Sequence, residues 1–123
     1  IRDRISKEPL GPVVRQGDDV WYNIVKWALY AMINGEELGV TSQNIEEMKI
    51  SNSLNVQRFF GLSGSGGKGL GLADNWAAEI IRQVGNYGEV FEENFGSSAV
   101  NSIERGLNKL WSEGGLQYAP PLR

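Results

Sequence analysis

Glycine is the feature that most restricts what this chain can fold into, because 16 of its 123 residues are glycine and they recur along most of its length. Glycine loses more backbone entropy on folding than any other residue, and it is common just beyond the end of a helix. After Gly35 the apolar stretches are therefore interrupted before any of them becomes long. The pattern predicts one long helix near the N-terminus followed by several short ones.

Apolar residues spaced three or four apart indicate where these helices lie. The strongest begins at Gly17-Asp18-Asp19, where an aspartate can cap the free amides, and ends near Gly35 or Gly39. Its predicted buried face consists of Trp21, Ile24, Val25, Ala28, Leu29 and Met32. Five short helices are expected to follow: one capped by Thr41 or Ser42, one capped by Asn52 or Ser53 and ending at Gly61, one capped by Asp74 and ending at Gly85, one carrying Tyr87 and ending at Gly96, and one from Ser97 or Ser98 to Gly114.

The expected fold class is thus mainly α, with five to six short helices and one N-terminal extended strand. Residues 1–17 are predicted to be extended because Pro9, Gly11 and Pro12 disfavour a helix. Leu10 to Val14 would form one short strand or crossing segment, but no second strand is predicted to pair with it. The chain therefore looks like part of a larger α/β protein, with an extended segment at 1–17 and a helical region of a single domain at 18–123.

Composition excludes several classes of function. The chain has no cysteine and no histidine, so it lacks the residues of disulfides, thiol nucleophiles, Ser-His triads and the usual zinc or copper sites. The net charge is -3, and the 12 Lys and Arg residues are scattered singly, which argues against nucleic acid as a partner. No apolar run approaches the roughly 20 residues of a membrane span.

The glycine-rich stretch from Gly64 to Gly69 formally matches a dinucleotide fingerprint, and Gly67-Lys68 is similar to the Gly-Lys of a phosphate loop. A fingerprint needs a strand before it and a helix that opens on it. Here a short helix is expected before the loop, and the next helix begins only near Asp74, whose charge would repel phosphate. The stretch is therefore interpreted as a flexible structural loop.

Three acidic pairs could be mistaken for catalytic carboxylates: Glu36-Glu37, Glu46-Glu47 and Glu92-Glu93. Adjacent residues on a helix point about 100° apart, so the two members of a pair do not face each other. Solvated helix faces are the expected role. The four tryptophans lie on or beside the predicted apolar faces, where packing in the core is expected.

Two long stretches resemble a known family. The first stretch resembles the segment by which polar and general L-amino-acid-binding proteins return from the second lobe to a first-lobe helix. It consists of Ile5-Ser6-Lys7-Glu8-Pro9-Leu10-Gly11-Pro12-Val13-Val14-Arg15, Gly17-Asp18-Asp19 and Trp21 to Trp27. The second stretch is similar to the helical C-terminal extension of the general amino-acid-binding branch. It consists of Gly67 to Ala77, Gln83 to Glu92, Glu104 to Asn108 and Gly114-Gly115-Leu116-Gln117-Tyr118-Ala119-Pro120-Pro121-Leu122-Arg123. The resemblance is looser at Lys49 to Asn55 and at Ser63 to Gly66.

The resemblance implies the C-terminal part of an α/β periplasmic binding protein that captures an L-amino acid and delivers it to the membrane permease of an ABC importer. Such proteins work by hinge closure and perform no chemistry. Family members are well over twice as long, and the acidic residue and the arginine that hold the amino acid lie in parts with no counterpart here. No ligand-binding residue of this chain is therefore identified. A signal peptide, if present, would lie upstream of Ile1.

The interpretation is a non-catalytic segment with no catalytic, cofactor-binding or metal-ligating residues. It would supply the hinge return, a first-lobe helix and the C-terminal helical cap of the parent protein. The alternative is a stand-alone helical oligomerisation or interaction module derived from the same family, and an enzyme is the least supported reading. Because the strand and one face of the long helix lack cover, the isolated chain is expected to form a homodimer.

If the glycine-rich loop is indifferent to nucleotides, then Lys68→Ala should leave the melting temperature nearly unchanged with and without ATP. The physical reason is that Asp74 opposes an anion and that no helix opens on the loop. Thermal unfolding followed by circular dichroism is the measurement. An ATP-dependent rise in melting temperature that disappears in Lys68→Ala would contradict the interpretation.

Overall fold

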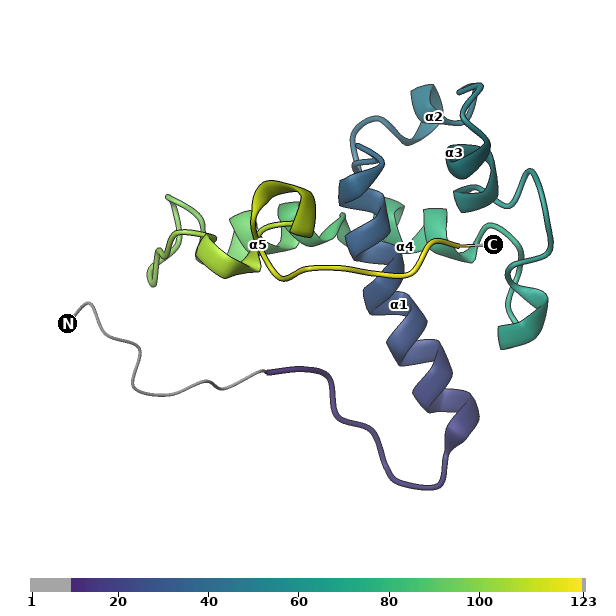
Figure 1. Cartoon of the computed structure of the whole chain (residues 1–123), viewed down its shortest axis with the longest axis horizontal. Coiled ribbons are helices and arrows are strands. Elements are labelled where there is room, and N and C mark those ends of the chain that lie inside the picture. The colour runs from purple at the N-terminus through teal and green to yellow at the C-terminus, as the bar shows by residue number, and fades with distance from the viewer. Residues whose placement is uncertain (1–9, 123) are drawn as a thin grey trace.

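A computed structural model describes residues 10–122 of the chain (Figure 1). The elements follow in the order α1 (Asp19–Glu37), α2 (Ile45–Met48), α3 (Leu54–Phe59), the 3₁₀ turn η1 (Lys68–Leu70), α4 (Trp76–Val84), α5 (Tyr87–Phe95), η2 (Gly106–Asn108) and η3 (Trp111–Glu113). Strand pairing among residues 10–122 is limited to one isolated parallel bridge between Leu110 and Gln117. The predicted mainly α fold class is therefore confirmed.

Local hydrogen bonds and one glycine set the two ends of helix α1. The carboxylate of Asp18 accepts a hydrogen bond from the Trp21 amide at 2.9 Å, which satisfies one of the free amides of the first turn. At the other end Gly39 takes a φ of +70°, and the amides of Gly39 and Val40 donate to the carbonyls of Glu36 and Gly35. This is the Schellman arrangement, and it explains why the helix stops at the glycine expected from the sequence.

The main core forms where the C-terminal half of α1 packs against α4 (Figure 1). A Cβ atom on Gly35 would lie 2.9 Å from Cδ1 of Ile81, so the missing side chain lets Ile81 of α4 pack directly against the α1 backbone. The buried members of this core are Ala31, Val40, Ile45, Val56, Phe59, Phe60, Trp76, Ala77, Ala78 and Ile81. The core thus joins α1, α2, α3 and α4.

The last part of the chain lies across the other side of α1 and is not the helix predicted from residue 97 to Gly114. It contains only η2 and η3, because Gly106 adopts a φ of +48° and the preceding serines and asparagine favour turns. Ile33, Leu110 and Ala119 form a small second core there. The buried Asn34 side chain donates to the carbonyls of Tyr30 and Pro120, both at 2.9 Å, and so fastens the C-terminal segment to α1.

A polar cluster joins the start of α5 to the turn that follows α1. Asn86 and Glu89 form a capping box, in which each side chain accepts a hydrogen bond from the other's backbone amide. The Glu89 carboxylate also accepts from the amide and the hydroxyl of Ser42, and the Asn86 amide group donates to the carbonyl of Val40 at 2.9 Å. Five donor groups find an acceptor in this way.

Two of the predicted helix caps lie one or more residues from their observed positions. Helix α4 follows Asn75, not Asp74, and the Asp74 carboxylate instead accepts a hydrogen bond from the Gly67 amide at 3.3 Å. Helix α2 follows Asn44, while Thr41 and Asn44 exchange side-chain to backbone hydrogen bonds within the preceding turn. Ser53 precedes α3 as expected, without a side-chain cap. Asp74 and Thr41 use their side chains in the preceding turns instead of capping a helix.

The segment at residues 10–17 has no strand in the structure. Leu10 and Val13 are each 94% exposed, and Gly17 takes a φ of +87°, which turns the chain into α1. No second strand was predicted to pair with this segment, and within residues 10–122 none pairs with it. Residues 1–9 of the predicted extended segment, and Arg123, lie outside the described part of the chain.

The cluster around Glu89 gives a test of how these turns hold the fold together. Glu89→Ala should lower the free energy of unfolding by about 1–3 kcal/mol, because the Asn86 and Ser42 amides lose their acceptor. Urea unfolding is the measurement. Glu93→Ala, at an exposed position of the same helix, is the control and should change stability by less than about 0.5 kcal/mol. Equal effects of the two substitutions would show that the cluster contributes nothing specific.

Candidate functional site

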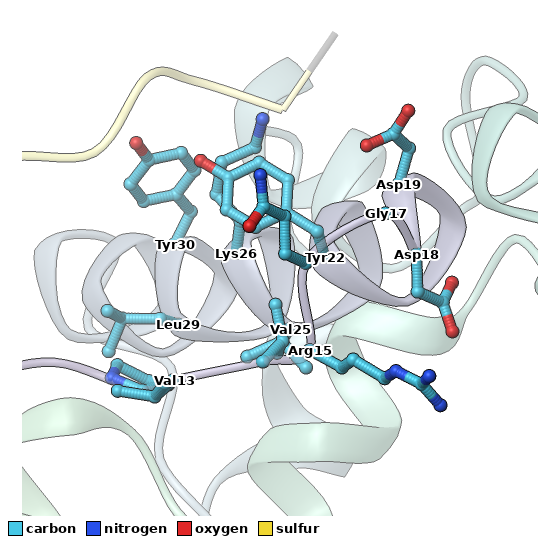
Figure 2. A pocket seen from close by; sticks show the side chains of 13 residues that line it. Val13, Arg15, Gly17, Asp18, Asp19, Tyr22, Val25, Lys26, Leu29 and Tyr30 are labelled. Carbon is cyan, nitrogen blue, oxygen red and sulfur yellow. The ribbon is translucent and has the colours of Figure 1, made fainter.

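A groove with a mainly apolar lining lies between residues 12–18 and helix α1 (Figure 2). It has a volume of about 600 Å³. Val13 on the extended segment lies near Leu29 of α1, because Gly17 turns the chain back along the helix. Tyr22, Val25 and Lys26 line the same groove nearer the start of α1. An extended segment and a helix therefore form its two walls.

The groove takes up only part of the predicted buried face of α1. Of the six residues predicted for that face, Val25 and Leu29 line the groove, Met32 packs against the main core, and Trp21 is 52% exposed. The buried residues of α1 are Ala31, Ile33, Asn34 and Gly35, all in its C-terminal half. The N-terminal half of α1 carries apolar residues with incomplete cover.

The charges around the groove do not form a catalytic arrangement. Arg15, Asp18, Asp19 and Lys26 line it, yet no ion pair within 4.0 Å joins any two of them in the described structure. Asp18 caps α1, and the Lys26 ammonium lies 4.9 Å from the centre of the Tyr22 ring. Among residues 10–122 there is no cluster of three potential metal-ligating side chains. The arrangement suits packing against another apolar surface.

A half-buried arginine has the geometry of a carboxylate-binding group, but its carboxylate comes from the chain itself. Arg105 makes a bidentate pair with Glu36 and donates to the carbonyl of Asn108 at 2.8 Å. Its guanidinium lies 5.6 Å from the Tyr87 ring centre and 5.5 Å from that of Phe91. This cluster ties the C-terminal segment to α1 and α5.

The electrostatics of this cluster follow from its pairing and burial. The hydrogen bonds with Glu36 raise the pKa of Arg105 above its ordinary value, so the guanidinium stays charged. Desolvation raises the pKa of Tyr87, which therefore remains a neutral phenol at neutral pH. The Arg105 Nε is buried and has no hydrogen-bond partner among the described residues.

Glu36 was expected on a solvated helix face, and this expectation was wrong. Its side chain is 14% exposed, whereas Glu46 is 75% exposed and pairs with Lys49 and Arg82 at the surface. The hydrogen bond from Lys49 lowers the pKa of Glu46. Glu37, Glu47, Glu92 and Glu93 are solvated as expected, apart from a weak contact of Glu92 with the Ser97 amide. No pattern near Glu36 signals an arginine 69 residues later in the chain.

The tryptophans divide into two groups. Trp76 is 8% exposed in the main core and Trp27 packs against that core, as expected. Trp21 and Trp111 are each 52% exposed, so core packing does not describe them. Trp111 packs edge-to-face on Tyr118 with ring centres 6.0 Å apart.

The glycine-rich loop does not have the geometry of a phosphate loop. Helix α3 precedes it, and what opens within it is the single 3₁₀ turn η1. The Lys68 side chain is exposed, and the Asp74 carboxylate accepts a hydrogen bond from the Gly67 amide of the loop.

None of the helices among residues 10–122 has both the length and the apolar character that a membrane span requires.

Comparison with known proteins identifies relatives over almost the whole chain, although no protein-family model matches it. The chain is 55% identical over 121 residues to the general L-amino acid-binding periplasmic protein AapJ of Rhizobium johnstonii, covering 97% of this chain and 36% of that protein. It is 53% identical over 120 residues to the putative amino-acid ABC transporter-binding protein YhdW of Escherichia coli K12, covering 97% and 35%. It is 51% identical over 120 residues to the glutamate/glutamine/aspartate/asparagine-binding protein BztA of Rhodobacter capsulatus, covering 97% and 36%.

A solved structure gives the same answer in three dimensions. The ABC transporter periplasmic binding protein from Brucella ovis with glutathione bound superposes on all of this chain with a TM-score of 0.94 and 47% sequence identity. The match covers 39% of that protein. The chain is therefore homologous along nearly its entire length to the periplasmic binding proteins of amino-acid ABC transporters, and it spans a little more than a third of their length.

Proposed function

We propose that the chain is a non-catalytic segment of a periplasmic amino-acid-binding protein that serves an ABC importer. The observation that carries the proposal is 55% identity over 97% of the chain to a general L-amino acid-binding periplasmic protein. The superposition on a periplasmic binding protein supports it independently of sequence patterns. The relatives are solute-binding proteins and not enzymes, so this chain is not expected to perform chemistry.

Within that parent protein the chain would have two parts. Residues 1–17 would be the extended return segment near the hinge, and residues 18–123 would be the helical region that includes a first-lobe helix and a C-terminal helical cap. The groove beside α1 supports this division, because an exposed apolar helix face next to an extended segment needs a partner surface. The relatives are long enough to supply one.

Contacts to the amino-acid ligand would come largely from outside this segment. A bound zwitterion needs a cation for its carboxylate and an anion for its ammonium. Both terminal nitrogens of Arg105 already donate to Glu36, and the groove beside α1 is lined by residues of both charge signs. The parent protein would bind an L-amino acid and dock on a membrane permease in the periplasm.

The segment by itself is expected not to bind polar or acidic amino acids, since a buried zwitterion without partners is unstable. Isothermal titration calorimetry of the 123-residue chain with such a panel is the measurement. The Rhizobium johnstonii protein, titrated under the same conditions, serves as the positive control. Micromolar binding of any polar or acidic amino acid to the isolated chain would contradict the proposal.

A second candidate is a stand-alone helical oligomerisation or interaction module, and a specific observation favours keeping it. Val13 is 94% exposed and Trp21 is 52% exposed on either side of the turn at Gly17. Burying one large apolar side chain contributes about 1.5–3 kcal/mol, so two copies would gain by covering these surfaces. An isologous contact would pair each patch with its own kind. The intact mass of the product isolated from cells separates the candidates, because a parent protein would be far larger than 13.6 kDa.

The isolated chain is accordingly expected to form a homodimer at micromolar concentration. Light scattering should report about twice the monomer mass of 13.6 kDa. Val13→Lys should dissociate the dimer if the extended segment carries the contact, and Ile24→Glu should do so if α1 carries it. Val100→Lys is the matched control, because Val100 is also a fully exposed valine but lies far along the chain from the groove. A monomer mass for the unmodified chain would refute self-association.

A further inference from the structure

Asn34 and Gly35 form the single Asn-Gly pair in the sequence. Asparagine followed by glycine loses its side-chain amide readily in a flexible backbone, because glycine has no side chain to hinder the reaction. Solvent base removes the Gly35 amide proton, and the nitrogen attacks Cγ of Asn34 to close a succinimide ring. The side-chain nitrogen takes up a proton and leaves as ammonia. Water then opens the ring at either carbonyl, which gives aspartate or isoaspartate.

The backbone of α1 blocks the first step of this reaction. Gly35 lies inside the helix, where its amide donates to the carbonyl four residues earlier. The Asn34 side chain points toward the start of the helix, whereas the Gly35 nitrogen follows it in the chain. The Asn34 carbonyl accepts a hydrogen bond from the Leu38 amide at 2.9 Å, and the Val40 amide holds the Gly35 carbonyl. Ring closure therefore requires this part of α1 to unwind.

The reacting side chain is held as firmly as the backbone. Asn34 is 7% exposed, and its side-chain nitrogen donates to the carbonyls of Tyr30 and Pro120, both at 2.9 Å. Figure 1 shows the C-terminal segment crossing α1. On the side of Gly35, a Cβ atom would lie 2.9 Å from Cδ1 of Ile81, so α4 packs directly on the backbone. The native fold thus shields the pair from two sides.

Neither product fits the place that Asn34 occupies. An aspartate carboxylate only accepts hydrogen bonds, so it would face the carbonyl oxygens of Tyr30 and Pro120 as a buried, unpaired charge. Isoaspartate adds one carbon atom to the main chain inside α1, and the residues after it then leave the helical register. That shift falls at the contact between Gly35 and Ile81.

We propose that Asn34-Gly35 is a deamidation site that the native fold protects and that unfolding opens, and that its modification prevents the chain from returning to the native fold. The reaction converts a reversible unfolding event into a covalent change. The inference goes beyond the proposed function and does not depend on it, since it rests on the packing of this chain alone.

The first test compares reactivity within one chain. Asn52 and Asn101 are each followed by serine, and both are exposed and outside helices, so they serve as internal references. Incubation at mildly alkaline pH, followed by peptide mapping with mass spectrometry, gives the rate at each asparagine. In native buffer Asn34 should react last of the three. In guanidinium chloride it should react first, at least about tenfold faster than in the native chain. An equal rate at Asn34 in both conditions would overturn the proposal.

Matched variants test whether the packing provides the protection. Ile81→Ala removes the side chain that packs on Gly35 and raises the population of open molecules, so Asn34 should react at least about tenfold faster in native buffer. Ile50→Ala is the control, because Ile50 is 83% exposed. Its rate at Asn34 should equal that of the unmodified chain. Equal rates in the two variants would contradict protection by the core.

Refolding tests the effect of the modification. Chains that have partly reacted in guanidinium chloride are returned to native buffer, and the folded fraction is isolated by size exclusion and mapped. Molecules modified at Asn34 should be depleted from the folded fraction, while molecules modified at Asn101 should be as frequent there as in the starting mixture. The same proportion of Asn34-modified chains in the folded fraction and the starting mixture would refute the proposed block to refolding.

Discussion

The close crossing of α1 and α4 is the contact on which the rest of this structure depends. Gly35 lets Ile81 reach the α1 backbone, and the buried residues of four helices gather around that point. Interiors of proteins are packed as tightly as organic crystals, so even one added methyl group at such a crossing forces neighbours to move. Helix α5 and the C-terminal segment then pack on other sides of the same half of α1. The first half of the helix has less cover: Trp27 packs against the main core, while Tyr22, Val25 and Lys26 line the groove.

The parts of this fold that could be predicted from sequence are those set by neighbouring residues. The Asp18 cap, the ends of helices at Gly39, Gly61 and Gly85, and the mainly α class all follow from local backbone chemistry. The predicted helix after residue 97 failed because Gly106 interrupts it, although the apolar spacing was helical. Local propensity is a weak guide where turns and tertiary contacts compete with it.

The functional features were less predictable because they are made of distant residues. The pairing of Glu36 with Arg105 spans 69 positions, so an acidic pair on a helix face gave no sign that one member would be buried. The groove beside α1 was anticipated only as an uncovered apolar surface, and Tyr22, Lys26 and Tyr30 were not foreseen in it. The glycine-rich loop was predicted to be structural, but the reason for its glycines emerged only from their packing on residues 72–74.

The order in which the contacts of α1 lie along the chain has a consequence for how the molecule forms. Asn34 is fastened to Pro120, 86 positions later, and Glu36 to Arg105, 69 positions later. During translation α1 is synthesised before Arg105 and Pro120. This side of the helix therefore stays exposed to solvent until those partners have been synthesised. Long-range closures of this kind slow folding, because chain entropy is lost before the contact forms. The helix that organises the core is thus also the element that waits longest for its full cover.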